Sequence, residues 1–215
     1  MTEMHRRVVL AGATSRAGLT IARALAAAGH EVISTGRTAE RLAPLAEAGS
    51  GIEVADATSF EAMRTLAERI GPIDGVIPLV GGWRGGGGLA GQSDDDFEAL
   101  LPSLQAVRAT SRAFDAALRA SPAGRFAIVS SVMVERPLAG SANYIALKAA
   151  SEAWTRAVAQ GYAKAARDAD EPLRAAAGIV RVRGLDDVAD RVAAHIAQLW
   201  DENAATLNGQ VVEFV

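Results

Sequence analysis

Short runs of β-branched and other apolar residues alternate along this chain with longer alanine-rich stretches that have helical periodicity. The strand-like runs are residues 7–11, 31–35, 51–55, 73–80, 125–130, 173–180 and 210–215. The helix-like stretches are residues 17–29, 39–48, 58–70, 94–120, 141–167 and 186–200. This alternation is typical of a parallel sheet with helices on both faces. We therefore expect an α/β fold: a Rossmann-like, doubly wound parallel sheet of about seven strands.

Local signals refine two of these helices. Thr58, followed by Glu61, resembles a capping box and predicts the start of the third helix. Pro102 lies inside the fourth stretch and predicts a kink there. With 215 residues and neither a repeat nor an interdomain linker, the sequence predicts a single domain over residues 1–215.

Composition excludes several classes of function. The net charge of −3 gives no reason to expect nucleic acid or a membrane surface as a partner. The chain has no cysteine, and its three histidines lack metal-ligand spacing, so we expect no metal site. Residues 1–7 are polar and no apolar stretch is long enough to span a bilayer, which predicts a cytoplasmic protein.

A glycine-containing turn joins the first predicted strand to the first helix. Such a turn lets backbone N–H groups and a helix N-terminus approach a pyrophosphate. The residues that we expect to bind a dinucleotide here are Gly12, Thr14, Ser15, Arg16 and Gly18. A tight strand–helix connection without a ligand is the alternative, because a glycine-rich turn alone is a weak signal.

Arg37 follows the second predicted strand, where an acidic residue would bind a ribose 2′-hydroxyl and an arginine suits a 2′-phosphate. The sequence therefore favours NADP(H), with NAD(H) as the alternative, although 20 of the 22 basic residues are arginine. Asp56, after the third strand, is placed to contact the adenine edge of the cofactor. A helix-entry carboxylate beside Thr58 is an equally good interpretation of Asp56.

Tyr144 and Lys148 lie four residues apart in one predicted helix and hence on the same face. Ser131 lies thirteen residues before Tyr144, at the carboxyl end of the fifth strand, where open α/β sheets bind their ligands. A nearby ammonium favours the tyrosinate, so we expect Lys148 to lower the pKa of Tyr144 for acid–base work. Ser131 would hydrogen-bond a carbonyl oxygen. A surface pair beside an ordinary serine is the alternative.

These motifs resemble those of the short-chain dehydrogenase/reductase family over nearly the whole chain. The matching segments are residues 12–18, 35–37, 54–57, 130–132, 144–148 and 208–212. The resemblance implies that Ser131, Tyr144 and Lys148 are the catalytic trio. It also implies that Tyr144 and Lys148 contact the cofactor, and that Val80 and Gly81 shape its site. The family usually forms dimers or tetramers through its two long central helices, here 94–120 and 141–167.

The chain departs from the family pattern in four places. Ser15 and Arg16 stand where the middle glycine of the loop would fall, and Pro78-Leu79-Val80-Gly81 replaces Asn-Asn-Ala-Gly. Ser103 takes the place of the asparagine that often completes a catalytic tetrad; its hydroxyl could still position a water but cannot supply an amide. In the family a Pro-Gly turn follows the sixth strand and leads into a segment that covers the substrate. The turn aligns here near Val180-Arg181, and the covering segment is almost absent. The glycine-rich residues 83–88 could serve as a mobile cover instead, or form a disordered surface insertion.

The resemblance implies an oxidoreductase that transfers a hydride between NADP(H) and a small carbonyl or alcohol. A non-catalytic binding or assembly subunit is a second hypothesis, supported by the altered cofactor segments. A third hypothesis keeps Tyr144 and Lys148 for non-redox acid–base chemistry. The identity of the small-molecule substrate and the direction of hydride transfer stay open.

Overall fold

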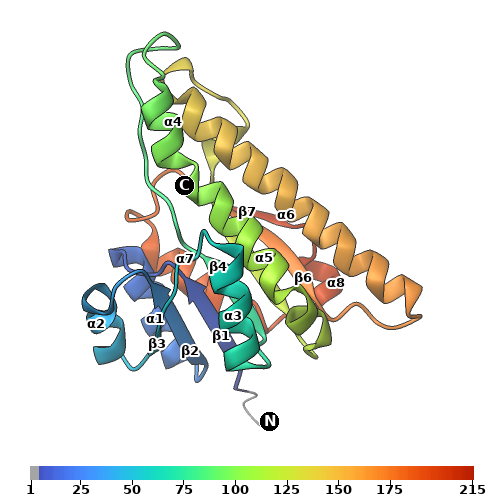
Figure 1. Cartoon of the computed structure of the whole chain (residues 1–215). Coiled ribbons are helices and arrows are strands. Elements are labelled where there is room, and N and C mark those ends of the chain that lie inside the picture. The colour runs from blue at the N-terminus through green and yellow to red at the C-terminus, as the bar shows by residue number, and fades with distance from the viewer. Residues whose placement is uncertain (1–4) are drawn as a thin grey trace.

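A seven-stranded sheet forms the centre of the molecule in a computed structural model, which describes residues 5–215 (Figure 1). The strand order is β3-β2-β1-β4-β5-β6-β7, and every pair of neighbouring strands is parallel. The strands are β1 (Arg7–Ala11), β2 (Glu31–Gly36), β3 (Gly51–Val54), β4 (Gly75–Pro78), β5 (Arg125–Ser131), β6 (Ala176–Val182) and β7 (Val211–Phe214). This arrangement confirms the doubly wound α/β fold expected from the sequence.

Helices cover both faces of the sheet and form two core layers. One layer packs α1 (Arg16–Ala27), α2 (Ala39–Glu47) and α7 (Ala189–Ala197) against the sheet. The other packs α3 (Phe60–Ile70), α5 (Pro102–Ala120) and α6 (Ala142–Asp168) against the opposite face. Two short helices complete the fold: α4 (Asp94–Leu100) lies near the top of the molecule in Figure 1, and α8 (Ala204–Leu207) packs beside β6.

The central strands are buried on both faces, which explains their continuous apolar sequences. In β1, Val8 and Leu10 point into the layer of α1, α2 and α7, whereas Val9 and Ala11 point into the other layer. This alternation is the two-residue period of a strand. The carboxyl ends of β1, β4 and β5 therefore meet at one edge of the sheet, above a core that fixes their positions.

The first turn of α3 differs from the prediction by one residue. Ser59, not Thr58, is the N-cap, and its Oγ accepts a hydrogen bond from the N–H of Ala62 at 3.2 Å. Thr58 instead donates to Asp56, through its backbone N–H at 2.9 Å and its hydroxyl at 2.8 Å. The Asp56 carboxylate thus stabilises a turn with Thr58, and α3 begins one residue later than predicted.

The predicted helix over residues 94–120 is two helices, α4 and α5, separated at Leu101. Pro102 is the first residue of α5, a position that does not require the N–H that proline lacks. Leu101 itself keeps right-handed helical angles, and its N–H donates to the carbonyl of Phe97 at 2.9 Å, so the interruption is the expected kink. Its consequence is that α4 leaves the core and rises with the first turns of α6 beyond the edge of the sheet (Figure 1).

The end of the sheet also differs from the prediction. The sixth strand was expected over residues 173–180, but β6 spans Ala176–Val182, so that Arg181 lies inside the strand. The turn that follows is therefore at Arg183-Gly184, not at residues 180–181. Helix α7 starts at Ala189, not at residue 186, and β4 is shorter than the predicted 73–80.

The glycine-rich loop after β4 has defined partners. The N–H of Gly86 donates to the carbonyl of Gly140 at 2.7 Å, and the side-chain amide of Gln92 donates to Gly86 O at 3.0 Å. Asn143, in the first turn of α6, donates its N–H to the Gln92 side-chain oxygen at 3.1 Å. These bonds attach the loop to the segment that leads into α6.

Two further expectations concern the whole chain. None of the helices within residues 5–215 has the length and apolar character needed to cross a bilayer. The expected absence of a signal segment depends in part on residues 1–4, which lie outside the described residues. Within residues 5–215, no three His, Asp or Glu side chains gather as metal ligands.

Candidate active site

Two adjoining cavities lie across the carboxyl ends of the central strands. Their volumes are about 370 and about 350 Å³, and both are lined by Ser15, Leu79, Val80 and Gly81. The first extends over β2 and β3, and its other lining residues are Gly12, Thr14, Gly36, Arg37, Arg41, Ala55, Asp56, Ala57, Thr58, Ala99 and Pro102. The second extends over β5 and β6 and reaches Tyr144 and Lys148. Together they form one extended cleft at the edge where open α/β sheets bind ligands.

Gly12 turns the chain from β1 into the loop below this cleft. Its φ of +76° is one that residues with a Cβ rarely adopt. A Cβ at this position would also lie 2.4 Å from Cγ2 of Val80. The Gly12 N–H donates to the Thr35 hydroxyl at 3.0 Å, which fixes the loop to β2. Val80, in the segment after β4 that departs from the family pattern, therefore packs directly against the loop between β1 and α1.

The missing middle glycine does not distort the loop. Ser15 has extended backbone angles, and its Oγ accepts a hydrogen bond from the Gly18 N–H at 3.1 Å as the N-cap of α1. Gly18 is required for close packing, because a Cβ there would lie 2.1 Å from the carbonyl oxygen of Ala13. Gly12 adopts the positive φ, and Gly18 allows the start of α1 to approach the Ala13 carbonyl. Ser15 stands in the region of the missing glycine and caps α1.

The loop presents unpaired N–H groups at the start of α1. Within residues 5–215, the backbone N–H groups of Thr14, Ser15 and Arg16 have no hydrogen-bond partner. Such groups at a helix N-terminus form a site for an anion. They lie where the two cavities join, so the residues present fit the pyrophosphate of a dinucleotide that spans the cleft.

The far end of the first cavity carries positive charge. Arg37 is exposed on the cleft wall, as expected, and Arg41 in the first turn of α2 lines the same cavity. Arg41 was not among the residues predicted from the sequence, although its position four residues after Arg37 was the available signal. Asp56 lines this cavity and accepts hydrogen bonds from Thr58 ahead of α3, whereas its expected contact with the adenine edge stays a prediction.

Arg16 lies outside the cleft lining. Its side chain is largely exposed and forms an ion pair with Asp186, at 3.7 Å, from the segment after β6. Arg16 therefore contributes its backbone N–H to the anion site, and its side chain links the two sides of the cleft mouth.

Two members of the expected trio line the second cavity. Tyr144 and Lys148, on α6, line it together with Ser130 of β5. Ser131, at the end of β5, does not line the cavity, but its side chain acts on the Tyr144 phenol and favours the ionised form. The Nζ of Lys148 donates to the carbonyl of Val129 at 2.8 Å and lies 5.7 Å from the centre of the Tyr144 ring. Ser131 is completely buried, and its Oγ also accepts from the Met133 N–H at 3.2 Å.

The ionisation of the pair differs from the expectation. Burial raises the pKa of Tyr144 above its ordinary value, and the hydrogen bond from Ser131 offsets only part of this effect. Burial lowers the pKa of Lys148 to about 8, with the negative charge of Glu152 acting in the opposite direction. The expected lowering of the Tyr144 pKa is thus wrong. At neutral pH Tyr144 is a phenol that can donate a proton.

Ser103 does not join the trio in this structure. Its hydroxyl donates to the carbonyl of Leu100 at 2.8 Å, at the break between α4 and α5. It lines neither of the two cavities. Its expected role in positioning a water stays a prediction.

A short segment after β6 borders the second cavity in place of the missing substrate-covering segment. Arg183, Gly184, Leu185, Asp186 and Asp187 line the cavity opposite the glycine-rich loop, where Trp83 lies with most of its surface exposed. The sequence did not predict this wall, because the helix that becomes α7 was expected to begin at residue 186. The region around Tyr144 is therefore bordered by two loops and covered by neither.

The comparisons with known proteins agree with this geometry. The family model for short chain dehydrogenase matches residues 6–166. No curated protein matches the chain. A solved short chain dehydrogenase from Shigella flexneri is 20% identical and superposes with a TM-score of 0.80 over 98% of this chain and 91% of that chain.

A short-chain type dehydrogenase/reductase from Mycobacterium ulcerans gives a TM-score of 0.82 at 17% identity, over 97% of this chain and 87% of that chain. At these identities the structural likeness establishes the fold, and the family model establishes the family. The chain therefore belongs to the short-chain dehydrogenases, a family of oxidoreductases that use nicotinamide dinucleotides.

Proposed function

We propose that this protein transfers a hydride between NADP(H) and a small carbonyl or alcohol substrate. The observation that carries this proposal is the meeting of Ser131, Tyr144 and Lys148 beside the unpaired N–H groups of the loop before α1. One cleft thereby joins an anion site to a proton donor. Neither a binding subunit nor a structural protein requires that combination.

The bound nicotinamide supplies the hydride chemistry. In the reducing direction, the Tyr144 phenol donates its proton to the carbonyl oxygen as that oxygen gains negative charge. The Ser131 hydroxyl, which accepts from the Met133 N–H, would hydrogen-bond the same oxygen. The Lys148 ammonium provides positive charge near the ring of Tyr144 and stabilises the tyrosinate that remains.

The pH dependence follows from the two pKa shifts. Reduction needs the phenol of Tyr144 and the ammonium of Lys148, so kcat/KM for reduction should be constant around pH 7. It should fall as the pH rises through about 8, where Lys148 loses its proton. Alcohol oxidation needs the tyrosinate, whose pKa is raised, and should be slow at neutral pH. Initial rates in both directions between pH 6 and pH 10 measure this, and equal profiles in the two directions would contradict it.

Arg37 and Arg41 support the preference for NADP(H), because two guanidinium groups on one wall suit a 2′-phosphate. Replacing both with alanine should weaken NADPH binding by about 10-fold to 100-fold, since charge-assisted hydrogen bonds contribute ~1.5–3 kcal/mol. NADH binding should change little. Isothermal titration calorimetry with NADPH and with NADH measures the two dissociation constants in the wild-type protein and the variant.

Arg23→Ala is the matched control, because Arg23 is an exposed arginine of α1 that does not line the cleft. A wild-type protein that binds NADH more tightly than NADPH would contradict the preference. Binding of neither cofactor by the folded protein would overturn the proposed function. Product formation without stoichiometric NADPH oxidation would favour the non-redox acid–base hypothesis.

Self-association through α5 and α6 is part of the same proposal. Both helices lie on one face of the sheet, and α6 projects beyond its edge (Figure 1). Small side chains such as Ala150 and Ala153 are exposed on α6 and permit close approach of another helix. We expect a dimer or tetramer, and light scattering coupled to gel filtration measures the mass. A monomer at micromolar concentration would contradict it.

A further inference from the structure

Helix α6 presents three polar side chains at four-residue intervals to the end of β5. Tyr144 faces Ser131, whose side chain favours its ionised form, and Lys148 donates to the carbonyl of Val129 at 2.8 Å. One turn further, Glu152 accepts a hydrogen bond from the Ser130 hydroxyl at 2.7 Å. Because i, i+4 and i+8 positions share one face of a helix, the three side chains form a single row. The last three residues of β5 thus each face one member of this row, and Val129 and Ser130 are bonded to theirs.

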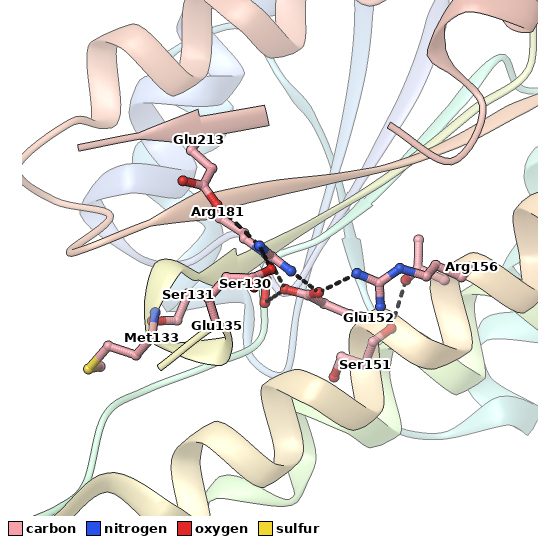
Figure 2. Close-up of polar contacts among 10 residues, drawn as sticks. Ser130, Ser131, Met133, Glu135, Ser151, Glu152, Arg156, Arg181 and Glu213 are labelled. Atoms are coloured by element: carbon pink, nitrogen blue, oxygen red, sulfur yellow. Dashed lines mark hydrogen bonds and ion pairs between the residues drawn. The ribbon is translucent and has the colours of Figure 1, made fainter. Parts of the chain in front are cut away.

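Glu152 is the most constrained of the three. Its side chain is completely buried, and its two oxygens accept four hydrogen bonds (Figure 2). Ser130 and Nε of Arg181 bind Oε1 at 2.7 and 2.9 Å, and Nη2 of Arg181 and Nη2 of Arg156 each bind Oε2 at 2.8 Å. These bonds hold the pKa of the carboxyl below its ordinary value despite burial. Glu152 is therefore an ionised carboxylate in the interior.

Arg181 forms ion pairs with three carboxylates around Glu152, counting Glu152 itself. Besides Glu152 it pairs with Glu135, which follows β5, and with Glu213 of β7 at 3.1 Å (Figure 2). A buried ion pair is costly to form and contributes little net stability, whereas removal of one partner is strongly destabilising. The position of this pair, directly behind Ser130 and Lys148, points to a role beyond stability.

We propose that Glu152 is a positioning residue for the catalytic pair: it anchors the end of β5 through Ser130 and places a negative charge one helical turn from the Lys148 ammonium. This inference rests on the proposed function. Glu152 does not line the cleft and touches neither substrate nor cofactor. It acts through Lys148 and β5.

The electrostatic part of the proposal concerns Lys148. Burial alone drives the ammonium toward its neutral form, and Glu152 is the charged residue whose field opposes this. The other charged or titratable groups around Lys148 come from several elements. Those that share its cavity or contact it are Tyr144 on α6 and Arg183, Asp186 and Asp187 after β6. Those that surround its partner Glu152 are Arg156 on α6, Arg181 on β6, and Glu135 and Glu213, which pair with Arg181.

The pKa of Lys148 can be measured directly, because the chain has only two lysines, Lys148 and Lys164. Lysine labelled with 13C at Cε should give two NMR resonances, and the exposed Lys164 serves as an internal reference. In Glu152→Gln the pKa of Lys148 should fall below its value of about 8 by about half a pH unit or more, the effect of one charge at this separation. The Lys164 resonance should titrate unchanged.

Glu135→Gln is the matched control. It removes the same charge from the same partner, Arg181, but Glu135 is largely exposed and does not contact Ser130. We expect no shift of Lys148 in this variant. An unchanged Lys148 titration in Glu152→Gln, or an equal shift in Glu135→Gln, would overturn the proposal.

If Glu152→Gln fails to fold, Glu152→Gln combined with Arg181→Met avoids an unpaired buried charge. Because this variant also removes a positive charge, the pKa of Lys148 should fall in the same direction but by less than in Glu152→Gln. Ser130→Ala tests the anchoring part, because it keeps the charge and removes one hydrogen bond. The pKa of Lys148 should stay constant in Ser130→Ala while kcat falls severalfold and KM for the cofactor is unchanged. Wild-type kcat in Ser130→Ala would overturn the anchoring role.

In an active enzyme, the alkaline limb of kcat/KM in Glu152→Gln should move to lower pH by the same interval as the Lys148 resonance. A merely structural role would lower the rate at every pH without moving this limb. The NMR titration needs no substrate. An inactive wild-type protein would therefore contradict the proposed function, whereas an unmoved Lys148 resonance would contradict this inference.

Discussion

Phenylalanine in place of Tyr144 should lower kcat for carbonyl reduction by about 100-fold to 10,000-fold, the contribution typical of a positioned general acid. The phenol is the group that delivers the proton, and Ser131 and Lys148 are arranged around it. Affinity for NADPH should fall by less than the rate, because most of the cleft is unchanged. Steady-state kinetics with a reactive aldehyde or ketone, together with calorimetry, separates the two effects.

Tyr162→Phe is the matched control, because Tyr144 and Tyr162 are the only tyrosines of the chain. Tyr162 is almost fully buried in the layer of α5 and α6, and its hydroxyl has no partner within residues 5–215. Loss of that hydroxyl should leave activity unchanged and should not reduce stability. Turnover that survives in Tyr144→Phe, or disappears equally in Tyr162→Phe, would exclude Tyr144 as the proton donor.

The second large effect is expected at Gly18. An added Cβ would lie 2.1 Å from the Ala13 carbonyl oxygen, so Gly18→Ala must move the loop or the start of α1. Overpacking of this kind costs about 1–3 kcal/mol of the free energy of unfolding. Affinity for NADPH should fall as well, because the unpaired N–H groups of Thr14, Ser15 and Arg16 would shift. Chemical denaturation and calorimetry measure the two losses.

Gly161→Ala is the control for this substitution. Gly161 lies in α6 with open space around it, so alanine there should stabilise the protein by about 0.5–1 kcal/mol through helix propensity. The two glycine-to-alanine changes should therefore have opposite signs. A Gly18→Ala protein with wild-type stability and wild-type affinity would mean that the loop does not bind the cofactor.

Hydrophobic periodicity was sufficient to predict the sheet and its main helices, because the central strands are buried on both faces and their apolar runs are continuous. It could not place the ends of elements that depend on side-chain hydrogen bonds. Asp56 captures Thr58, and the cap of α3 moves to Ser59. The charged Arg181 seemed to end β6, although the structure buries it against Glu152.

The same limit applies to the candidate site. The spacing of Ser131, Tyr144 and Lys148 predicted which residues meet, since helix and strand geometry translate spacing into position. The pKa of Tyr144 depends on how much water the fold removes, which spacing does not encode. Glu152 was missed because a glutamate in an alanine-rich helix ordinarily faces solvent, and its burial depends on Arg181, 29 residues further along the chain.

The row formed by Tyr144, Lys148 and Glu152 on α6 limits where the chain can gain or lose residues. An inserted or deleted residue between Tyr144 and Glu152 would rotate one end of the row by about 100° relative to the other, since a helix turns once every ~3.6 residues. At least one of the contacts to Val129, Ser130 and Ser131 would then be lost in a single step. The loops at residues 81–92 and 183–188 border the cleft without such a constraint. Divergence among relatives should therefore place insertions in these two loops and keep this stretch of α6 at constant length.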